Sequence, residues 1–510
     1  MAEEIARGGP ADSQLLFYAM YSDRRGMSAL APDALPFLLA LARDPALPAR
    51  VEVLLALNLL VGCARTQPVE RIAQGWRSGW QACRPAAEPL VADQDPKVRR
   101  WAVDLVEHPG PLLDQLRAET EPSIRIQLLL RLGRVAAPTT DEQAQAARAT
   151  IDQAPAVRLA ALWALNRQDP DGAAGRLDEL VELFADPLTP ASVGLLWQPA
   201  DEEYRYELPH LILPTAEDLP GDVAAQFTGR LAATGEPELR VAALDAAWRV
   251  LATRPSAGPG SASMAGGLLD DPDPRIRHRA VHLLAMLGKA AAPFADRLFA
   301  LLDDPDGDEL LDGGTADFAH WALARIGDAR VLPRLVRRLT AMEAEQGRSW
   351  SGGEPRRPEP YDALIALPEH AGALRPEVAA WEGRGFMGGA DVLAVWDGRA
   401  LPARRPSAPS VLELVAGRLR RIPHTYQPWQ DLRPYRSAMV AVAALSRLGP
   451  LPPKVRAAVE HALSLDRRLS EEVDYRAVLD DERLRDMLQR ALQGEAVHMP
   501  ALSRPSHSFA

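Results

Sequence analysis

The sequence predicts an all-α chain, an α-α superhelix of about ten helix pairs interrupted by irregular insertions. A short motif of proline, an apolar residue and arginine recurs along the chain, which is typical of structural repeats. Each copy leads into Ala and Leu residues at steps of three and four, the spacing of one apolar helix face. Aromatic residues make up only 5% of the 510 residues, and sustained apolar alternation is scarce, which disfavours a sizeable sheet.

The recurring motif begins five predicted helices and places an arginine in the first turn of each. The segments read DPKVRRWAVDLV, EPSIRIQLLLRLG, APAVRLAALWALN, EPELRVAALDAAW and DPDPRIRHRAVHLLAMLG, and their arginines are Arg99, Arg125, Arg158, Arg240 and Arg277. The intervals between them are irregular but close to the length of a two-helix repeat or a multiple of it.

Residues 270–302 illustrate one predicted repeat. Asp273 is expected to cap the helix start, and Pro274 suits the first helical position because its missing N–H costs nothing there. An apolar stripe follows, and Gly288 can end the helix in a left-handed conformation. A second helix is predicted from about Pro293. Neither helix can bury its stripe alone, so neighbouring pairs are expected to stack.

The Pro-x-apolar-Arg pattern resembles the HEAT-repeat family, particularly its short bacterial variety. The resemblance covers about residues 30–340 well and residues 430–466 more weakly. It implies an α-solenoid in which each motif arginine braces adjacent repeats by pairing with an acidic residue. It implies little about activity, because such proteins include scaffolds, transport adaptors and a few enzymes.

Composition shifts divide the chain into predicted segments. Residues 1–345 form the solenoid, with an acidic insertion at 186–222 and a flexible connecting loop at 254–267. Residues 346–410 are an irregular segment rich in Gly, Pro and Trp, residues 411–493 form C-terminal helical repeats, and residues 494–510 form a disordered tail.

Charge and motif content narrow the function. A net charge of -11 disfavours nucleic acid, because binding to phosphates usually needs a basic excess. The two cysteines and the lack of a long apolar stretch favour a cytoplasmic protein with no membrane segment. Phosphate-binding loops, dinucleotide fingerprints and nucleophile elbows are absent from the sequence, so neither a cofactor nor a catalytic residue is predicted.

One alternative is an enzyme. His278 and His282 stand four residues apart and so share a helix face, the spacing at which two imidazoles can bind one metal, with Asp317 as a third ligand. Arg279 lies between them where metallopeptidases carry a general-base Glu, so this is a weak candidate site. A DNA glycosylase of the same fold is a further alternative, and the acidic charge disfavours it.

The preferred interpretation is a non-enzymatic scaffold or adaptor that binds a protein or peptide on the concave side of the superhelix. The expected contact residues lie five positions after each motif arginine or its aligned equivalent, namely Asp104, Trp163, Asp245, His282 and Trp321. Tryptophan with scattered charges is typical of protein contacts. For Trp163 and Trp321, burial between repeats is the alternative. The acidic residues 201–222 and the arginine-rich residues 399–421 are further candidate contact segments, and the alternative for the latter is a solvated linker.

Overall fold

The computed structural model describes residues 13–22, 25–67, 69–135, 154–186, 189, 193, 209–308, 311, 313–332, 334–335, 355, 358, 360–382, 389–397, 419, 433–470 and 474–502. They form two compact units, residues 1–208 and 209–510. The sequence predicts segment boundaries after residues 345, 410 and 493. The arginine-rich segment 399–421 lies almost wholly outside the described residues, as do residues 201–208 of the acidic segment.

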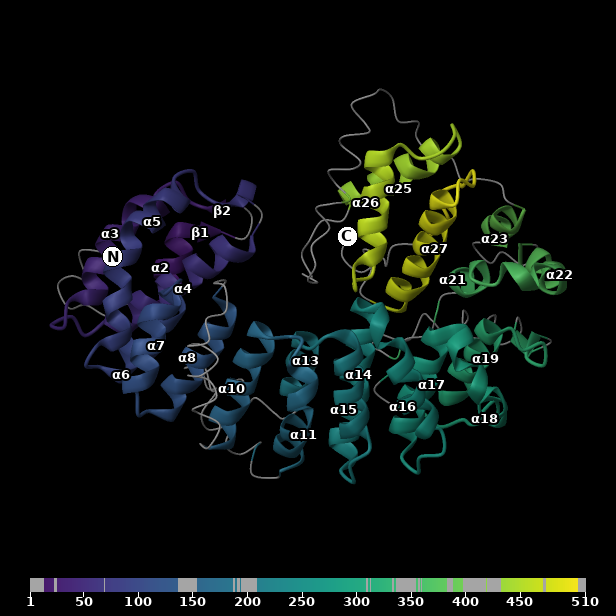
Figure 1. Ribbon diagram of the computed structural model, residues 1–510, viewed down its shortest axis with the longest axis horizontal. Helices are drawn as coiled ribbons and strands as arrows, with labels where there is room; N and C mark the ends of the chain where they lie inside the picture. The colour runs from purple at the N-terminus through teal and green to yellow at the C-terminus, as the bar shows by residue number, and fades with distance from the viewer. Residues whose placement is uncertain are drawn as a thin grey trace. The chain divides into compact units, whose positions relative to one another are not determined.

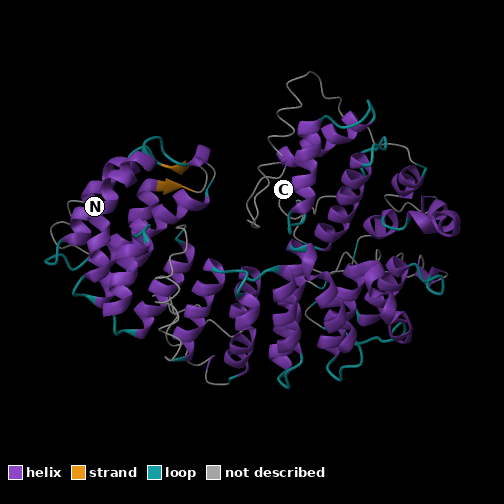
Figure 2. Ribbon diagram, in the orientation of Figure 1, coloured by secondary structure: helices purple, strands orange, loops and turns teal. Residues whose placement is uncertain are grey.

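The described residues of the first unit are mainly helical, with one two-stranded antiparallel hairpin that pairs Tyr21 with Met27 (Figures 1 and 2). Its elements are α2 (Ser13–Met20), β1 (Tyr21–Ser22), β2 (Gly26–Met27), α3 (Ala31–Arg43), α4 (Arg50–Thr66), the 3-10 helix η1 (Val69–Arg71), α5 (Trp76–Ala87), η2 (Glu88–Ala92), α6 (Pro96–Ala102), η3 (Val103–Leu105), α7 (Pro109–Ala118), α8 (Pro122–Arg134), α10 (Pro155–Gln168), η4 (Ala173–Arg176) and α11 (Leu177–Ala185).

The second unit is helical throughout its described residues. Its elements are α13 (Pro209–Asp218), α14 (Gly221–Ala232), α15 (Pro237–Thr253), η5 (Pro255–Ala257), α16 (Gly258–Gly267), α17 (Pro274–Leu287), η6 (Gly288–Phe294), α18 (Ala295–Ala300), α19 (Thr315–Ile326), α21 (Pro360–Ile365), η8 (Pro368–His370), α22 (Ala371–Glu382), α23 (Gly389–Trp396), α25 (Arg433–Ser446), α26 (Pro453–Ser464) and α27 (Tyr475–Leu492).

Consecutive helices pair, and the pairs stack in chain order within each unit. In the first unit α4 packs on α6, α6 on α8 and α8 on α10, while α3 packs on both α4 and α5. In the second unit α15 packs on α17 and α17 on α19, with α14 and α16 in contact alongside them. This stacking buries apolar stripes that no single helix could shield from water, and it confirms the predicted all-α solenoid.

The predicted helix starts are confirmed at α6 and α17. The Asp95 and Asp273 carboxylates accept hydrogen bonds from backbone amides of the first turn, at 2.9 Å in both helices. Gly288 follows α17 with a φ of 54°, a conformation that a side chain would strain.

The motif arginines connect successive repeats. Arg99 in α6 donates from Nε to Glu119 at 2.8 Å, in the turn that precedes α8. Arg277 in α17 likewise pairs with Asp304 before α19, at 3.2 Å, and Arg240 in α15 pairs with Asp271 before α17. Arg158 in α10 pairs instead with Glu179 of α11, at 3.0 Å.

The acidic residues at two of these turns, Glu119 and Asp271, each serve two repeats at once. Arg99 binds the side chain of Glu119, while Arg125 of the following helix donates to its backbone carbonyl oxygen at 2.6 Å. The Glu119 side chain also accepts from the Glu121 amide, two residues on, at 3.0 Å. Asp271 repeats the arrangement: its side chain binds Arg240 and its carbonyl oxygen accepts from Arg277 at 2.8 Å.

The prediction of a flexible loop at residues 254–267 is wrong, because most of this segment is helix α16. Its small residues allow close packing: a Cβ on Gly260 would lie 2.7 Å from the Ala225 Cβ, and one on Gly266 would lie 2.1 Å from the Phe294 ring. Glycine and alanine therefore mark a tight helix contact here.

Two other segments are more ordered than predicted. Residues 209–218, expected within an acidic loop, form α13, which packs on α15. Residues 494–502, expected in a disordered tail, pack on the C-terminal helices: Val497 is buried, and its amide donates to Ser446 Oγ at 3.1 Å. The irregular segment at residues 346–410 contains α21, α22 and α23.

The C-terminal helix α27 returns along the chain to pack against α15 and α17. Arg468, just before it, donates to the Leu251 carbonyl oxygen at the end of α15, at 3.1 Å. Tyr475 and Arg476 both donate to the buried Asp362 carboxylate, at 2.8 and 2.9 Å. The C-terminal repeats thus belong to the same compact unit as α15–α19.

Candidate functional site

The predicted contact residues are mostly buried. Trp163, His282 and Trp321 are 7%, 1% and 1% exposed and pack inside their units, so their side chains offer little surface to a partner. Asp104 lies half-buried in η3. Asp245 in α15 has a side chain that is 45% exposed, and it accepts from Arg279 Nε at 2.7 Å. These three aromatic side chains are therefore not available as contacts in the predicted groove.

The residues of the weak metal candidate, His278, His282 and Asp317, make other contacts in the structure. His278 Nδ1 accepts a hydrogen bond from the Asp308 amide at 3.0 Å, and Asp317 Oδ2 accepts one from the Gly314 amide at 3.0 Å, at the start of α19. His278 and His282 both pack on the Phe318 ring, with ring centres 5.1 Å apart in each case. In the described part of the chain no group of three or more His, Cys, Asp or Glu side chains is placed to hold a metal ion.

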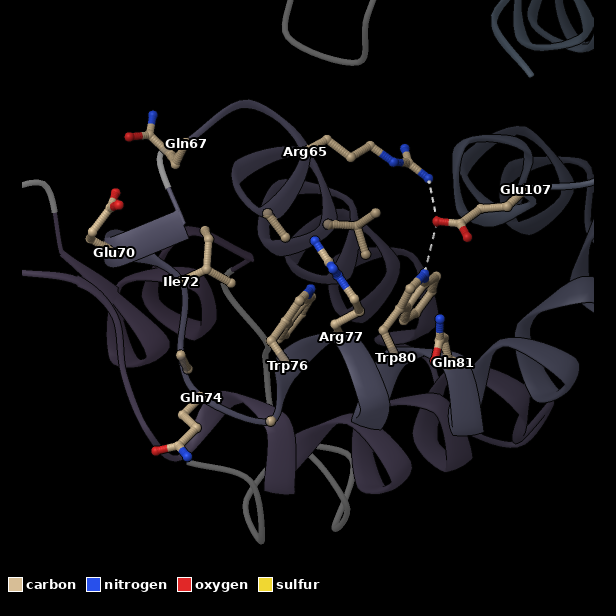
Figure 3. Close-up of a pocket in the computed structure, with 14 residues that line it drawn as sticks. Arg65, Gln67, Glu70, Ile72, Gln74, Trp76, Arg77, Trp80, Gln81 and Glu107 are labelled. Atoms are coloured by element: carbon tan, nitrogen blue, oxygen red, sulfur yellow. Dashed lines mark hydrogen bonds and ion pairs between the residues drawn. The ribbon is translucent and has the colours of Figure 1, made fainter. Parts of the chain in front are cut away.

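An open pocket lies in the first unit, where α4 ends and α5 begins (Figure 3). Its volume is about 910 Å³. Its described lining residues are Val61, Ala64, Arg65, Gln67, Glu70, Ile72, Ala73, Gln74, Gly75, Trp76, Arg77, Trp80, Gln81 and Glu107. The set combines apolar walls with a polar rim, the usual make-up of a binding site.

Two tryptophans form the floor of this pocket. Gly75 has a φ of 88°, which turns the chain directly into α5. Trp76 and Trp80 then lie one turn apart on the same face of α5 and are 4% and 6% exposed. Arg77 stands beside them and is exposed.

Glu107 closes one side of the pocket and is held by three donors. Its Oε1 accepts from Trp80 Nε1 at 3.0 Å and from Arg65 Nη2 at 3.3 Å (Figure 3), and its Oε2 accepts from Arg84 Nη1 at 3.4 Å. Burial opposes ionisation of this carboxyl, but the hydrogen bonds from Trp80 and Arg65 outweigh it and lower its pKa. Glu107 is therefore a charged structural acceptor.

A buried cation lies behind Glu107. Arg131 in α8 is 8% exposed and donates from Nε to the Val106 carbonyl oxygen at 2.8 Å. Among the described residues no carboxylate lies within ion-pair distance of it, whereas the buried Arg50 and Arg279 both pair with aspartates. Burial, together with repulsion from Arg65, lowers the pKa of Arg131 to about 10.

Sequence reasoning did not identify this pocket. The available signal was the segment GWRSGWQ, residues 75–81, where two tryptophans and an arginine share the first turns of a helix. Arg65 and Glu107 belong to no sequence motif. They reach the pocket because α4 stacks on α6 and because the chain turns after η3.

No helix among the described residues combines the length and the apolar character needed to cross a membrane.

No protein-family model and no curated protein sequence matches the chain. Solved structures resemble it at low identity. Kap121p matches with a TM-score of 0.39 at 14% identity, covering 96% of this chain and 50% of that one. The karyopherin Kap121p bound to the extreme C-terminus of the protein phosphatase Cdc14p gives 0.38 at 11%, covering 91% and 46%. An engineered protein gives 0.25 at 15%, covering 90% and 98%.

The chain spans about half the length of these karyopherin chains. Within each unit its helices pair, its pairs stack in order, and arginines in the first helical turn brace the next repeat. Each unit of the chain is therefore an all-α stack of paired helices, the architecture of an α-solenoid.

Proposed function

We propose that this chain is a non-enzymatic scaffold that binds a segment of a partner protein, with the Trp76/Trp80 pocket as its recognition site. The observation that carries the proposal is an open pocket whose floor is made by two tryptophans and whose rim is polar. Trp76 and Trp80 are almost fully buried and give the pocket its fixed shape, while the exposed side chains of Arg65, Gln74 and Arg77 supply surface that a partner can touch.

The chemistry of the lining also favours binding over catalysis. The described lining residues include no Ser, Cys, His or Lys that could act as a nucleophile. Of the two carboxylates, Glu107 is occupied by three donors and Glu70 is exposed at the rim. The apolar walls formed by Val61 and Ile72 suit an aliphatic or aromatic side chain.

Selection from a displayed library of random heptapeptides on the immobilised full chain tests this proposal. We expect enrichment of peptides with a bulky apolar residue. Substitution Ala64→Trp places a ring in the pocket and should weaken their binding by at least about tenfold, since about 1.4 kcal/mol of lost contact is sufficient. Asp114→Ala, on an exposed part of α7, should leave binding unchanged.

The folding of both variants is checked by far-ultraviolet circular dichroism and thermal unfolding. Two results contradict the proposal: no peptide family is enriched, or the enriched peptides bind Ala64→Trp as tightly as the unaltered chain.

A further inference from the structure

The first two helices of the first unit expose large apolar side chains. Of the seven such side chains that are exposed in the described part of the chain, four belong to α2 and to α3 with its N-cap residue. Leu15 and Tyr18 of α2 are 60% and 58% exposed, and Leu30 and Phe37 of α3 are 68% and 43% exposed. A single exposed apolar residue is common on protein surfaces, but this concentration at one place indicates an interaction surface.

On α2 these side chains point away from the rest of the stack. The helix packs on α4, and its buried residues are Leu16, Phe17 and Met20. Because successive residues of a helix are rotated by about 100°, Leu15 and Tyr18 lie on the side opposite these buried residues. One side of α2 is therefore held in the stack, and the other presents apolar side chains to water.

The residues of α3 divide in the same way. This helix packs on α5, where a Cβ on Gly79 would lie 3.6 Å from Leu35 Cδ1 and 3.6 Å from the Pro32 carbonyl oxygen. By the same rotation of about 100° per residue, Leu30 and Phe37 lie on the side of α3 opposite this contact. Since α4 continues the row that α2 begins and α5 continues the row that α3 begins, both apolar pairs lie at the N-terminal end of the stack (Figure 1).

The exposed area is that of one side of a stable interface. With about 200 Å² of surface for a large side chain, the four exposed fractions correspond to about 450 Å² of apolar surface. A standard interface buries about 800 Å² on each partner, and a little over half of this area, about 450 Å², is apolar. The end of a helical-repeat stack normally has a polar outer face, which keeps the protein soluble. An apolar end is therefore expected to be covered by another molecule.

The charge of this end favours a second copy of the same chain as the partner. α2 contains no charged residue, and Asp33 is the one charged residue of α3 between Leu30 and Phe37. A highly charged partner would lose water from its charges and meet no opposite charges in return. An identical face brings apolar surface instead, and a two-fold axis makes such a face complementary to itself.

We propose that two copies of the chain associate about a two-fold axis through the α2–α3 face, formed by Leu15, Tyr18, Leu30 and Phe37. In this dimer the helix stack of one copy meets that of the other end to end, and the apolar side chains of both are shielded from water. The dimer goes beyond the proposed function and does not depend on the Trp76/Trp80 pocket.

Sedimentation velocity of the full chain over a concentration series tests this proposal. We expect a species with twice the 55.4 kDa mass of one chain. The double variant Leu15→Lys/Tyr18→Lys should weaken the dimer by at least about 100-fold, because it replaces apolar contacts on both copies with like charges. Both side chains are exposed, so the variant should fold normally, which circular dichroism checks. Leu448→Lys, at a leucine of the second unit that is 85% exposed, is the matched control and should leave the dimer unchanged.

A mixture of two variants tests the two-fold symmetry. Leu15→Glu/Tyr18→Glu alone should be as monomeric as the lysine variant, because it also places like charges on both copies. When the two variants are mixed they should form a one-to-one dimer, since opposite charges then face each other across the axis. Formation of this dimer also demonstrates that both variants are folded.

Three results overturn the proposal. The first is a monomer at every concentration up to about 0.1 mM, which would leave the face to a different protein. The second is a dimer that the lysine variant does not weaken, and the third is a dimer that the lysine variant disrupts and the mixture does not restore. Dimers that form only after removal of residues 1–12 would identify that segment as the occupant in the intact chain and would also overturn the proposal. None of these results bears on peptide binding by the pocket.

Discussion

Acid should destabilise the second unit through its two buried histidines. His278 and His282 are 0% and 1% exposed, and burial lowers their pKa values to about 4 and about 3. An unfolded histidine titrates near pH 6.5, so between that pH and about pH 4 the unfolded chain binds protons that the native chain excludes. Stability conferred by the neutral imidazoles is therefore complete at pH 7 and is lost as the pH falls.

The magnitude follows from these pKa values. Going from pH 7 to pH 5, each histidine should lower the free energy of unfolding by about 2 kcal/mol, which makes about 4 kcal/mol for the two. The charged groups nearest to them are Arg279, Asp245, Asp308 and Asp317. Burial raises the pKa of Asp245, although its ion pair with Arg279 acts to lower it. Because this neighbour has a shifted pKa of its own, the contribution of the two histidines is best measured as a difference between variants.

Hydrogen exchange of the α17 amides at pH 7 and pH 5 measures this loss in the intact chain, where two units need not unfold in one transition. In the double variant His278→Asn/His282→Leu, Asn can still accept the hydrogen bond from the Asp308 amide that His278 Nδ1 accepts. The pH-dependent loss of protection should shrink by about 4 kcal/mol in this variant. His461→Leu, on α26, should behave like the unaltered chain. Equal losses in the double variant and the unaltered chain would refute the reasoning.

Two further predictions concern the packing of the repeats. Glu119→Ala removes the buried partner of Arg99 and should lower the free energy of unfolding by about 3 kcal/mol in urea titrations. Asp114→Ala, at an exposed ion pair, should change it by less than about 0.5 kcal/mol. Similar values for the two variants would show that the Arg99–Glu119 ion pair contributes little. Gly266→Ala places a Cβ 2.1 Å from the Phe294 ring and should cost about 1–3 kcal/mol, while Gly267→Ala meets nothing within 4 Å and should be neutral or slightly stabilising. If both alanines are tolerated alike in thermal unfolding, the close helix contact is not a constraint.

The repeats were predictable because local chemistry determines them. Proline, a capping acid and an arginine in the first turn specify where a helix starts, and the apolar stripe specifies that it must pair. Arg50 shows the limit of this pattern. It pairs with Asp93 as Arg99 does with Glu119, but its helix begins with Arg50 itself, so this arginine does not stand in a Pro-x-apolar-Arg motif.

Helix α16 was missed because glycine and serine are poor helix formers in isolation. Only the neighbouring Ala225 and Phe294, supplied by other helices, reveal that side chains would not fit there. In the same way, the spacing of His278 and His282 shows that they share a helix but not that the shared face is buried. The pocket could not be predicted as a unit, because Arg65, Trp76 and Glu107 come from separate elements that meet only in three dimensions.

The shared acids Asp93, Glu119 and Asp271 give the joints at which they stand similar chemistry. Asp93 is followed two residues later by Asp95 and a proline, and Glu119 is followed two residues later by Glu121 and a proline. A chain shortened by deletion of residues 93–118 would present Arg50 with the Glu119 carboxylate in place of that of Asp93, followed at the same spacing by an acid and a proline. The loss of one module would therefore still leave an acid at the new joint.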